Sequence, residues 1–352
     1  MEIRRREFLT TAACLVGGLA GSLHAQTPRR WVDVHHHILP PDYVEAVGSA
    51  AIGAPGKRSA APQWSVEASL DAMDKAGIAT ALTSISAPAL QFPVGNDRER
   101  QRIQRLVRGF NEFARTMAVD HPGRFGTFAT LCLPDVDASL AELAFSFDQL
   151  KVDGIVLLTN YNDRHLGDPA FAPLFDELER RKAVVFVHPT TCDCMAGMNT
   201  GVPLSSIEFP HETTRAVVSL WASGTFTRCP SVRFILPHAG GNVPYIATRV
   251  ARLNPHLAES LPLLKRQYYD VALSTYPQVL AALTRFAGTS QIVFGTDHPF
   301  GALGTAEATA RELEGLNLGA RVVEAIGRGN ALGLFPGLPQ DVGLRRRERP
   351  GR

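Results

Sequence analysis

The chain has 352 residues, and its 36 Lys and Arg nearly balance its 34 Asp and Glu, which gives a formal net charge of +2. A chain of this length can bury a large core in one α/β domain, and its near-neutral charge argues against a nucleic-acid-binding protein. The cysteines are too sparse for a disulfide framework. We interpret Cys192 and Cys194 as incidental loop residues, with a second metal or redox site as the less favoured alternative.

Residues 1–25 have the pattern of a signal peptide. The basic run Arg4-Arg5-Arg6 precedes a short apolar stretch at 10–23, and small residues follow. Such a stretch is shorter than the roughly 20 apolar residues that a transmembrane helix needs. Because Arg5-Arg6-x-Phe8-Leu9 fits the twin-arginine type, we expect export to the periplasm without a membrane anchor after processing. The alternative is a cytoplasmic protein that keeps an amphipathic N-terminal helix.

Apolar strands alternate with amphipathic helices through residues 30–336. The expected strands are 31–37, 79–84, 125–131, 154–160, 184–188, 232–238, 269–274 and 292–297. The expected helices are 66–76, 97–119, 138–150, 170–181, 212–223 and 277–286. This order predicts an α/β fold, a parallel (β/α)8 TIM barrel. A doubly wound sheet is the alternative, but no Gly-x-Gly-x-x-Gly follows the first strand.

Three segments fall outside this alternation. Residues 50–62, rich in Ala, Gly and Pro, predict a small loop inserted after the first strand. Residues 190–211, between the fifth strand and its helix, are expected to cover the active site. Residues 337–352 include the run Arg345-Arg346-Arg347-Glu348-Arg349 and predict a disordered basic tail.

The segment Trp31-Val32-Asp33-Val34-His35-His36-His37 carries the strongest functional signal. Alternate side chains of a strand share a face, so His35 and His37 point together and His36 points away. Two neutral imidazoles form half of a site for zinc or a similar divalent ion. The alternative is a polar strand end, or a histidine buried in the core.

Polar residues end three further strands of the predicted barrel. His188 ends the strand at 184–188, His238 ends the strand at 232–238, and Asp297 ends the strand at 292–297. Functional residues of such barrels lie at the carboxyl ends of the strands. The four histidines and the aspartate are therefore expected to meet at one face of the barrel.

The motifs around these residues resemble the metal-dependent decarboxylase branch of the amidohydrolase superfamily, which includes aminocarboxymuconate-semialdehyde and 6-methylsalicylate decarboxylases. The matching segments span about residues 31–335 and are Asp33-x-His35-x-His37-x-Leu39-Pro40, His188-Pro189, Glu212-Thr213-Thr214, His238-Ala239-Gly240-Gly241, Phe294-Gly295-Thr296-Asp297-His298-Pro299-Phe300 and Gly329-Asn330-Ala331-Leu332. The resemblance implies a barrel of the metal-dependent hydrolase type.

The resemblance implies one divalent ion, with zinc favoured over manganese, held by His35, His37, His188 and Asp297. It also implies that His238 acts as an acid/base beside the ion. Many binuclear relatives carry a lysine at the end of the fourth strand, but residues 154–160 contain none, so one ion is favoured over two.

A carboxylate substrate needs a cation, and arginine binds carboxylates with two hydrogen bonds. By the resemblance, Arg249 would reach the substrate of a neighbouring subunit, which implies a homodimer, and an ordinary helix-surface arginine is the equal alternative. Arg58 has no convincing match to the family's other arginine. His298 is interpreted as a pocket-wall residue, and Phe300, with Phe92 and Trp64, as an apolar wall for a ring.

Three function classes follow. The leading one is a carboxy-lyase that removes carbon dioxide from a small aromatic or conjugated acid, of the 6-methylsalicylate kind, with His238 or Asp297 delivering the proton. The second is a mononuclear hydrolase of a lactone or amide. The third is a periplasmic protein that binds a metal or ligand without catalysis.

Overall fold

The structure is a computed structural model, and it describes residues 30–52, 62–90, 96–198, 200–301 and 305–340. The expected signal peptide, most of the expected inserted loop with Arg58, Phe92, and the basic run at 345–349 lie outside the described residues. No helix within the described ranges has both the length and the apolar character needed to cross a membrane.

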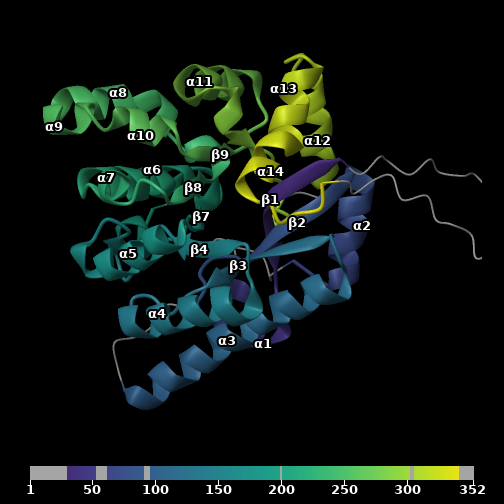
Figure 1. Cartoon of the computed structure of the whole chain (residues 1–352), viewed down its shortest axis with the longest axis vertical. Coiled ribbons are helices and arrows are strands. Elements are labelled where there is room, and N and C mark those ends of the chain that lie inside the picture. The colour runs from purple at the N-terminus through teal and green to yellow at the C-terminus, as the bar shows by residue number, and fades with distance from the viewer. Residues whose placement is uncertain (1–29, 53–61, 91–95, 199, 302–304, 341–352) are drawn as a thin grey trace, which may run out of the picture.

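Eight parallel strands form one curved sheet in the order β1-β2-β3-β4-β7-β8-β9-β10, with helices around it (Figure 1). The strands are β1 (Trp31–Ile38), β2 (Ile78–Ile85), β3 (Phe125–Thr130), β4 (Gly154–Leu158), β7 (Val184–His188), β8 (Arg233–Leu236), β9 (Tyr268–Asp270) and β10 (Ile292–Val293). The segment after β10 returns to β1: the amide of Val34 donates to the Phe294 carbonyl (3.0 Å), and that of Asp297 to the His35 carbonyl (2.8 Å). The predicted (β/α)8 barrel is confirmed.

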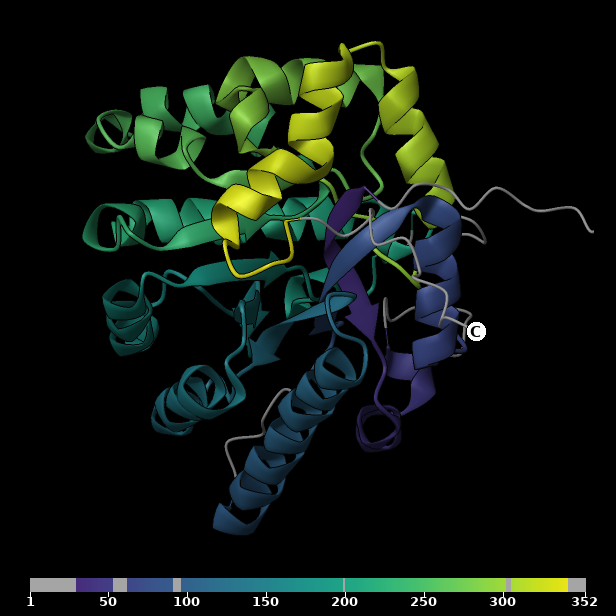
Figure 2. The same ribbon diagram turned by 45° about the vertical axis from the view of Figure 1, so that its right-hand side comes forward.

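Helices follow most strands and cover the outside of the barrel (Figure 2). They are α1 (Pro41–Val47), α2 (Val66–Ala76), α3 (Asp97–Asp120), α4 (Val136–Phe145), α5 (Ala172–Arg181), α6 (Glu208–Ala222), α7 (Thr225–Arg228), α8 (Val243–Leu253), α9 (Pro255–Ala258), α10 (Leu261–Lys265), α11 (Pro277–Ala287), α12 (Thr305–Gly315), α13 (Ala320–Glu324) and α14 (Asn330–Leu334).

Local sequence signals set the ends of several helices. The Ser65 hydroxyl accepts a hydrogen bond from the Ala68 amide at the start of α2, and Asn96 does the same for Glu99 at the start of α3. Each side chain satisfies an amide that has no partner within its helix. Gly77 ends α2 in the left-handed conformation, with φ of +72°, which glycine adopts without a steric penalty.

Several expected strands end earlier than their apolar pattern suggests: the one expected at 232–238 ends at Leu236 and the one expected at 292–297 at Val293. Two further early ends change which side chains reach the carboxyl end of the barrel. The strand expected at 154–160 stops at Leu158, and a two-stranded hairpin follows, formed by β5 (Asn160–Tyr161) and β6 (Arg164–His165). The strand expected at 269–274 ends at Asp270. Both changes place a polar side chain at the carboxyl end of the barrel instead of inside a strand.

An apolar plug fills the barrel interior below the candidate site. Phe128 stacks on Phe186 at 5.5 Å between ring centroids, and Phe335, after α14, packs edge-on against Phe128. Leu338, which the expected basic tail includes, is buried in the same cluster. Phe186 also packs edge to face with His35, with 4.8 Å between the ring centroids. The apolar cluster therefore lies directly beneath the polar residues.

Candidate metal centre

Four side chains with metal-binding atoms converge at the carboxyl ends of the strands. His35 and His37 come from β1, His188 is the last residue of β7, and Asp297 follows β10. All four are buried, and one ligand atom of each lies within 4.8 Å of the others. The structure therefore brings together the ligand set that the sequence predicts.

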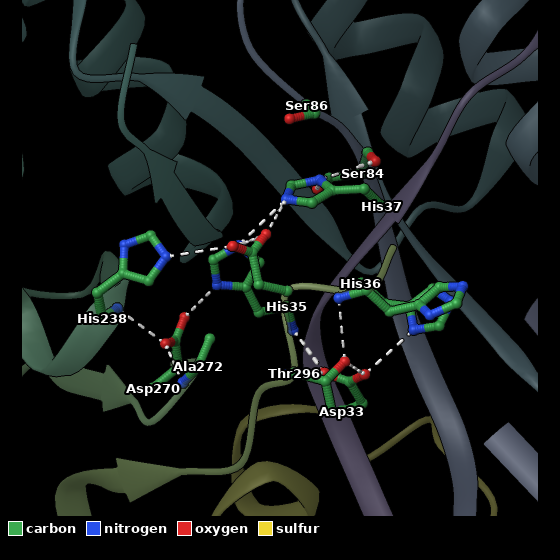
Figure 3. Close-up of polar contacts among 12 residues, drawn as sticks. Asp33, His35, His36, His37, Ser84, Ser86, His238, Asp270, Ala272 and Thr296 are labelled. Carbon is green, nitrogen blue, oxygen red and sulfur yellow. Dashed lines mark hydrogen bonds and ion pairs between the residues drawn. The ribbon is translucent and has the colours of Figure 1, made fainter. Parts of the chain in front are cut away.

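The alternation of β1 decides which histidines enter the site. The Nε2 atoms of His35 and His37 lie 3.1 Å apart, and both face Asp297 (Figure 3). His36 points to the other side of the strand, where its ring nitrogens contact Asp33 (3.1 Å) and Ser69 (3.2 Å). His36 is thus a buried structural residue beside the site.

Hydrogen bonds at the far ring nitrogens fix how the two imidazoles face the centre. His35 Nδ1 lies 2.9 Å from Asp270 Oδ2, which can only accept, so this nitrogen carries the proton. His37 Nδ1 contacts the Ser84 carbonyl (3.4 Å) and the Ser84 hydroxyl (3.2 Å). With both protons on Nδ1, each Nε2 presents a lone pair to the centre.

When an ion displaces any proton from the Nε2 atoms, three lone-pair atoms face one another at the centre. Asp297 Oδ1 lies 3.2 Å from His35 Nε2 and 3.1 Å from His37 Nε2, and these nitrogens are themselves 3.1 Å apart. Ligand atoms about 2.0–2.2 Å from a central zinc ion would be separated by distances of this order. His188, which belongs to the same group, has a buried Nδ1 that finds no hydrogen-bond partner within the described ranges. The four residues therefore fit a divalent ion.

The electrostatics of the cluster agree with this fit. Burial lowers the pKa of His37, and burial beside His37 and His35 lowers the pKa of His188 well below its usual value, so both rings are neutral ligands. Burial acts to raise the pKa of Asp297, but the nearby imidazoles of His35, His238 and His37 hold it well below its ordinary range.

His35 has the opposite shift. Burial acts to lower its pKa, yet the nearby carboxylates of Asp270 and Asp297 outweigh burial and raise the pKa to about 10. In the metal-free protein a proton thus takes the place that a cation would fill between these carboxylates.

Asp270 is the main site residue that the sequence interpretation missed. It is fully buried, and while one oxygen contacts His35, the other accepts from the amides of His238 (2.9 Å) and Ala272 (3.0 Å). Gly295 makes room for this pair, because a Cβ there would lie 2.9 Å from the His35 Cβ and 3.2 Å from the Asp270 Cβ. A signal was present, since Asp270 is a polar residue directly after an apolar pair, but the strand was expected to continue past it.

Asp33 fixes the segment that carries Asp297. Its carboxylate accepts from the His35 amide (3.0 Å), the Thr296 amide (3.1 Å) and the Thr296 hydroxyl (2.6 Å), so β1 is tied to the chain after β10. Asp297 itself has φ of +60°, in the left-handed region that non-glycine residues seldom adopt. This arrangement turns the Asp297 carboxylate inward.

His238 stands beside the four-residue cluster. Its Nε2 is 3.6 Å from Asp297 Oδ2, whereas Asp297 Oδ1 faces His35 and His37. Its backbone is also left-handed, with φ of +52°, and the following turn passes through Ala239 and Gly240 with positive φ. One carboxylate therefore links the candidate metal position to a histidine that can exchange a proton.

The three residues expected to bind substrate lie in different places. The Phe300 ring packs edge-on against His37 at 5.3 Å, next to the cluster. His298 stacks on His36 at 4.6 Å, on the side of β1 away from the metal centre, and burial near His36 lowers its pKa to about 3. Arg249 is exposed on α8 and is not part of the cluster.

The first prediction compares two histidines of β1 and β7. His188→Ala should lower bound metal and abolish turnover, because three remaining ligands hold an ion poorly. His36→Ala should keep the metal but unfold more easily, by about 1–3 kcal/mol, because it leaves buried partners without hydrogen bonds. Metal content by elemental analysis and thermal unfolding measure both effects. Full metal content in the His188→Ala protein would contradict this ligand set.

The second prediction concerns Asp270. In Asp270→Asn, an amide group that faces His35 Nδ1 would favour the proton on Nε2, where it blocks the metal lone pair. Metal affinity should fall about 10–100-fold, the usual effect of losing a carboxylate that orients a histidine ligand. Chelator competition measures the dissociation constant.

Asp153→Asn is the matched control, because Asp153 is a half-buried carboxylate that accepts from the Thr127 amide (2.8 Å) at the amino end of β4, away from the centre. Equal metal affinities of the two variants would show that Asp270 does not orient His35.

Comparisons with known proteins show what this chain is similar to. The decarboxylase yanB of Aspergillus niger is 37% identical over 336 residues, covering 89% of this chain and 89% of that protein. The 6-methylsalicylic acid decarboxylase of Penicillium expansum is 33% identical over 318 residues, covering 87% and 96%. The crystal structure of a dihydroxybenzoic acid decarboxylase from Polaromonas, with bound manganese and 2-nitroresorcinol, has a TM-score of 0.76 at 20% identity, covering 90% and 99%.

A family model described as amidohydrolase matches residues 32–337, which include the predicted metal ligands, His238 and Asp270. The resemblance seen in the sequence motifs is thereby confirmed. The chain belongs to the amidohydrolase family.

Proposed function

We propose that this protein is a metal-dependent carboxy-lyase that releases carbon dioxide from a small aromatic or conjugated carboxylic acid. The observation that carries the proposal is the Asp297 carboxylate, which faces His35 and His37 with one oxygen and His238 with the other. The names of the relatives from Aspergillus niger and Penicillium expansum support this reaction class, and within it we favour a 2-hydroxybenzoate of the 6-methylsalicylate kind.

His35, His37, His188 and Asp297 would hold the ion, with zinc our first choice and manganese, which the Polaromonas structure contains, our second. The bound ion would supply Lewis-acid chemistry to the phenolic oxygen and the adjacent carboxylate. The protein supplies the proton, which His238 or Asp297 delivers to the ring carbon that bears the carboxylate. The carbon–carbon bond then breaks, its electron pair returns to the ring and restores the aromatic system, and carbon dioxide leaves.

The surroundings of the centre suit a ring substrate. Phe300 contacts His37 and packs against an apolar cluster that includes Leu39, Ile52 and Ile85. On the opposite side, Phe186 closes the barrel beneath His35. Ligand sites of this kind combine an apolar wall with a few polar groups that fix orientation.

The direct test is a screen of the metal-loaded protein against hydroxybenzoates, with carbon dioxide release as the readout. Lactones and amides of similar size go through the same screen with product analysis by chromatography. Carbon dioxide from a hydroxybenzoate supports the proposal. Turnover of the lactones or amides alone would contradict it and favour the hydrolase.

The third prediction assigns His238 its role. His238→Asn should keep the bound metal and lose about two to four orders of magnitude in turnover, the usual contribution of an acid/base group. His298→Asn is the control, because His298 stacks on His36 away from the centre, and its turnover should change far less. Loss of the metal in the His238→Asn protein would show that His238 is a ligand. Unchanged turnover would show that His238 is not the acid/base.

We further propose that two copies of the chain form the active species, with Arg249 of one copy completing the pocket of the other. Supporting this, α8 presents apolar side chains to solvent around Arg249: Tyr245 is 89% exposed and Leu253 67% exposed, one turn before and one turn after it. Tyr276, at the start of α11, is also 53% exposed. Residues four apart share a helix face, and such apolar faces favour contact with another protein surface.

The fourth prediction tests this arrangement. Arg249→Ala should weaken binding of carboxylate substrates by about 1.5–3 kcal/mol, the range for hydrogen bonds to charged groups, with little effect on neutral esters. Arg285→Ala removes another exposed arginine, on α11, and should leave binding unchanged. Mixing Arg249→Ala with Asp297→Ala chains should restore part of the activity, because a mixed dimer has one intact site. Normal activity in a monomer would contradict the proposal.

A further inference from the structure

A second cluster of metal-binding atoms lies outside the centre described above. The sulfurs of Cys192 and Cys194 and a carboxylate oxygen of Glu212 all lie within 4.8 Å of one another. His165 adds an imidazole, because its Nε2 is 2.9 Å from Glu212 Oε1. Two sulfurs and one carboxylate oxygen thus lie together, and the His165 imidazole adjoins this group through Glu212.

Three separate segments are held together to form this cluster. His165 lies in the β5–β6 hairpin, the cysteines in the loop after β7, and Glu212 in α6. Asn160 joins all three, because its side-chain amide donates to Glu212 Oε1 (2.8 Å) and to the Thr191 carbonyl (3.1 Å). The arrangement is therefore built by tertiary hydrogen bonds, not by two neighbouring cysteines alone.

The two cysteines form a disulfide in this structure. Because they are two residues apart, the bond closes a very short loop and restricts the unfolded chain little. It also ties no distant segments together, since the hairpin and α6 are already joined through Asn160. The disulfide therefore adds little to the stability of the fold. Stability does not explain why the two cysteines lie beside a buried carboxylate.

The cluster is buried on the Glu212 side and exposed to solvent on the Cys194 side. Glu212 is fully buried, the His165 side chain is 27% exposed, Cys192 is half-buried and Cys194 is exposed. Burial acts to raise the pKa of Glu212, but hydrogen bonds from His165 and Asn160 hold it below its usual value, so the carboxylate is charged. A cation could approach from the Cys194 side and meet the carboxylate behind the sulfurs.

We propose that Cys192, Cys194, Glu212 and His165 form a second metal site, open only when the disulfide is reduced, for a thiophilic divalent cation such as zinc. An external thiol or phosphine supplies two electrons, is itself oxidised, and converts the disulfide with two protons into two thiols. The cation then displaces a proton from each thiol and binds two thiolates, one carboxylate and one imidazole, a donor set that suits zinc. A small external disulfide then takes two electrons from the thiolates and is reduced to two thiolates itself; the protein disulfide re-forms, which removes two ligands and releases the cation.

Cobalt(II) tests this site separately from the centre at His35, because only thiolate ligands give an intense near-ultraviolet charge-transfer absorption. The full chain, with its first centre loaded with zinc, is reduced anaerobically by a phosphine, freed of excess reductant and titrated with cobalt(II). Thiol counting should show two new thiols, and the absorption should saturate at one cobalt per chain. The oxidised chain should show no such absorption.

Four variants locate the ligands. Cys192→Ser should abolish the absorption, whereas Cys132→Ser, which removes a buried free cysteine elsewhere, should leave it intact. His165→Gln and Glu212→Gln should each weaken cobalt binding by at least about 10-fold, since even indirect partners of metal ligands have effects of that size. His165 is partly exposed, so its variant remains informative if Glu212→Gln folds poorly.

Three results would overturn the proposal. One is a disulfide that stays closed in the folded chain under reductant. Another is a reduced chain without the charge-transfer absorption, which would leave only a redox-active disulfide. The third is unchanged cobalt affinity in both His165→Gln and Glu212→Gln, which would reduce the site to a loose pair of cysteines.

Discussion

The structure around the candidate active centre depends on one electrostatic constraint, the meeting of three lone-pair atoms at Asp297 Oδ1, His35 Nε2 and His37 Nε2. Such atoms repel one another unless a proton or a cation lies between them. The high pKa of His35 is the response of the metal-free protein to this constraint. The same crowding makes the centre suitable for a divalent ion, because the ligands are already assembled before the ion binds.

Two residues of this arrangement adopt unfavourable backbone conformations. Asp297 and His238 both have positive φ, which costs a non-glycine residue roughly 1–2 kcal/mol. Two buried carboxylates offset that cost, because Asp33 accepts from the Thr296 amide and hydroxyl, and Asp270 accepts from the His238 amide. Asp270 also contacts His35, so one residue orients a metal ligand and positions the histidine that exchanges the proton. Ligand geometry and proton transfer therefore rest on the same side chain.

The sequence was sufficient for the barrel and for the meeting of the four predicted ligands at one face, because each of them ends an apolar segment. It was not sufficient for Asp270, since the apolar pattern continues past the point where β9 ends. It also did not show that His298 stacks on His36, because that contact joins residues 262 positions apart. The sequence did not show what lies near Cys192 for a related reason: Glu212 and His165 come from other segments, and Asn160 and the His165–Glu212 contact join these only in the fold.

The two clusters share the loop after β7, yet hydrogen bonds separate them. His188, a ligand of the first centre, precedes Cys192 by four residues. Between them, the His188 carbonyl accepts from the Thr159 amide (2.9 Å), and the Thr159 hydroxyl accepts from the Thr190 amide (3.1 Å). These bonds tie His188 and Thr190 to the end of β4. Because the barrel holds His188 in this way, we expect the two proposed sites to bind their cations independently.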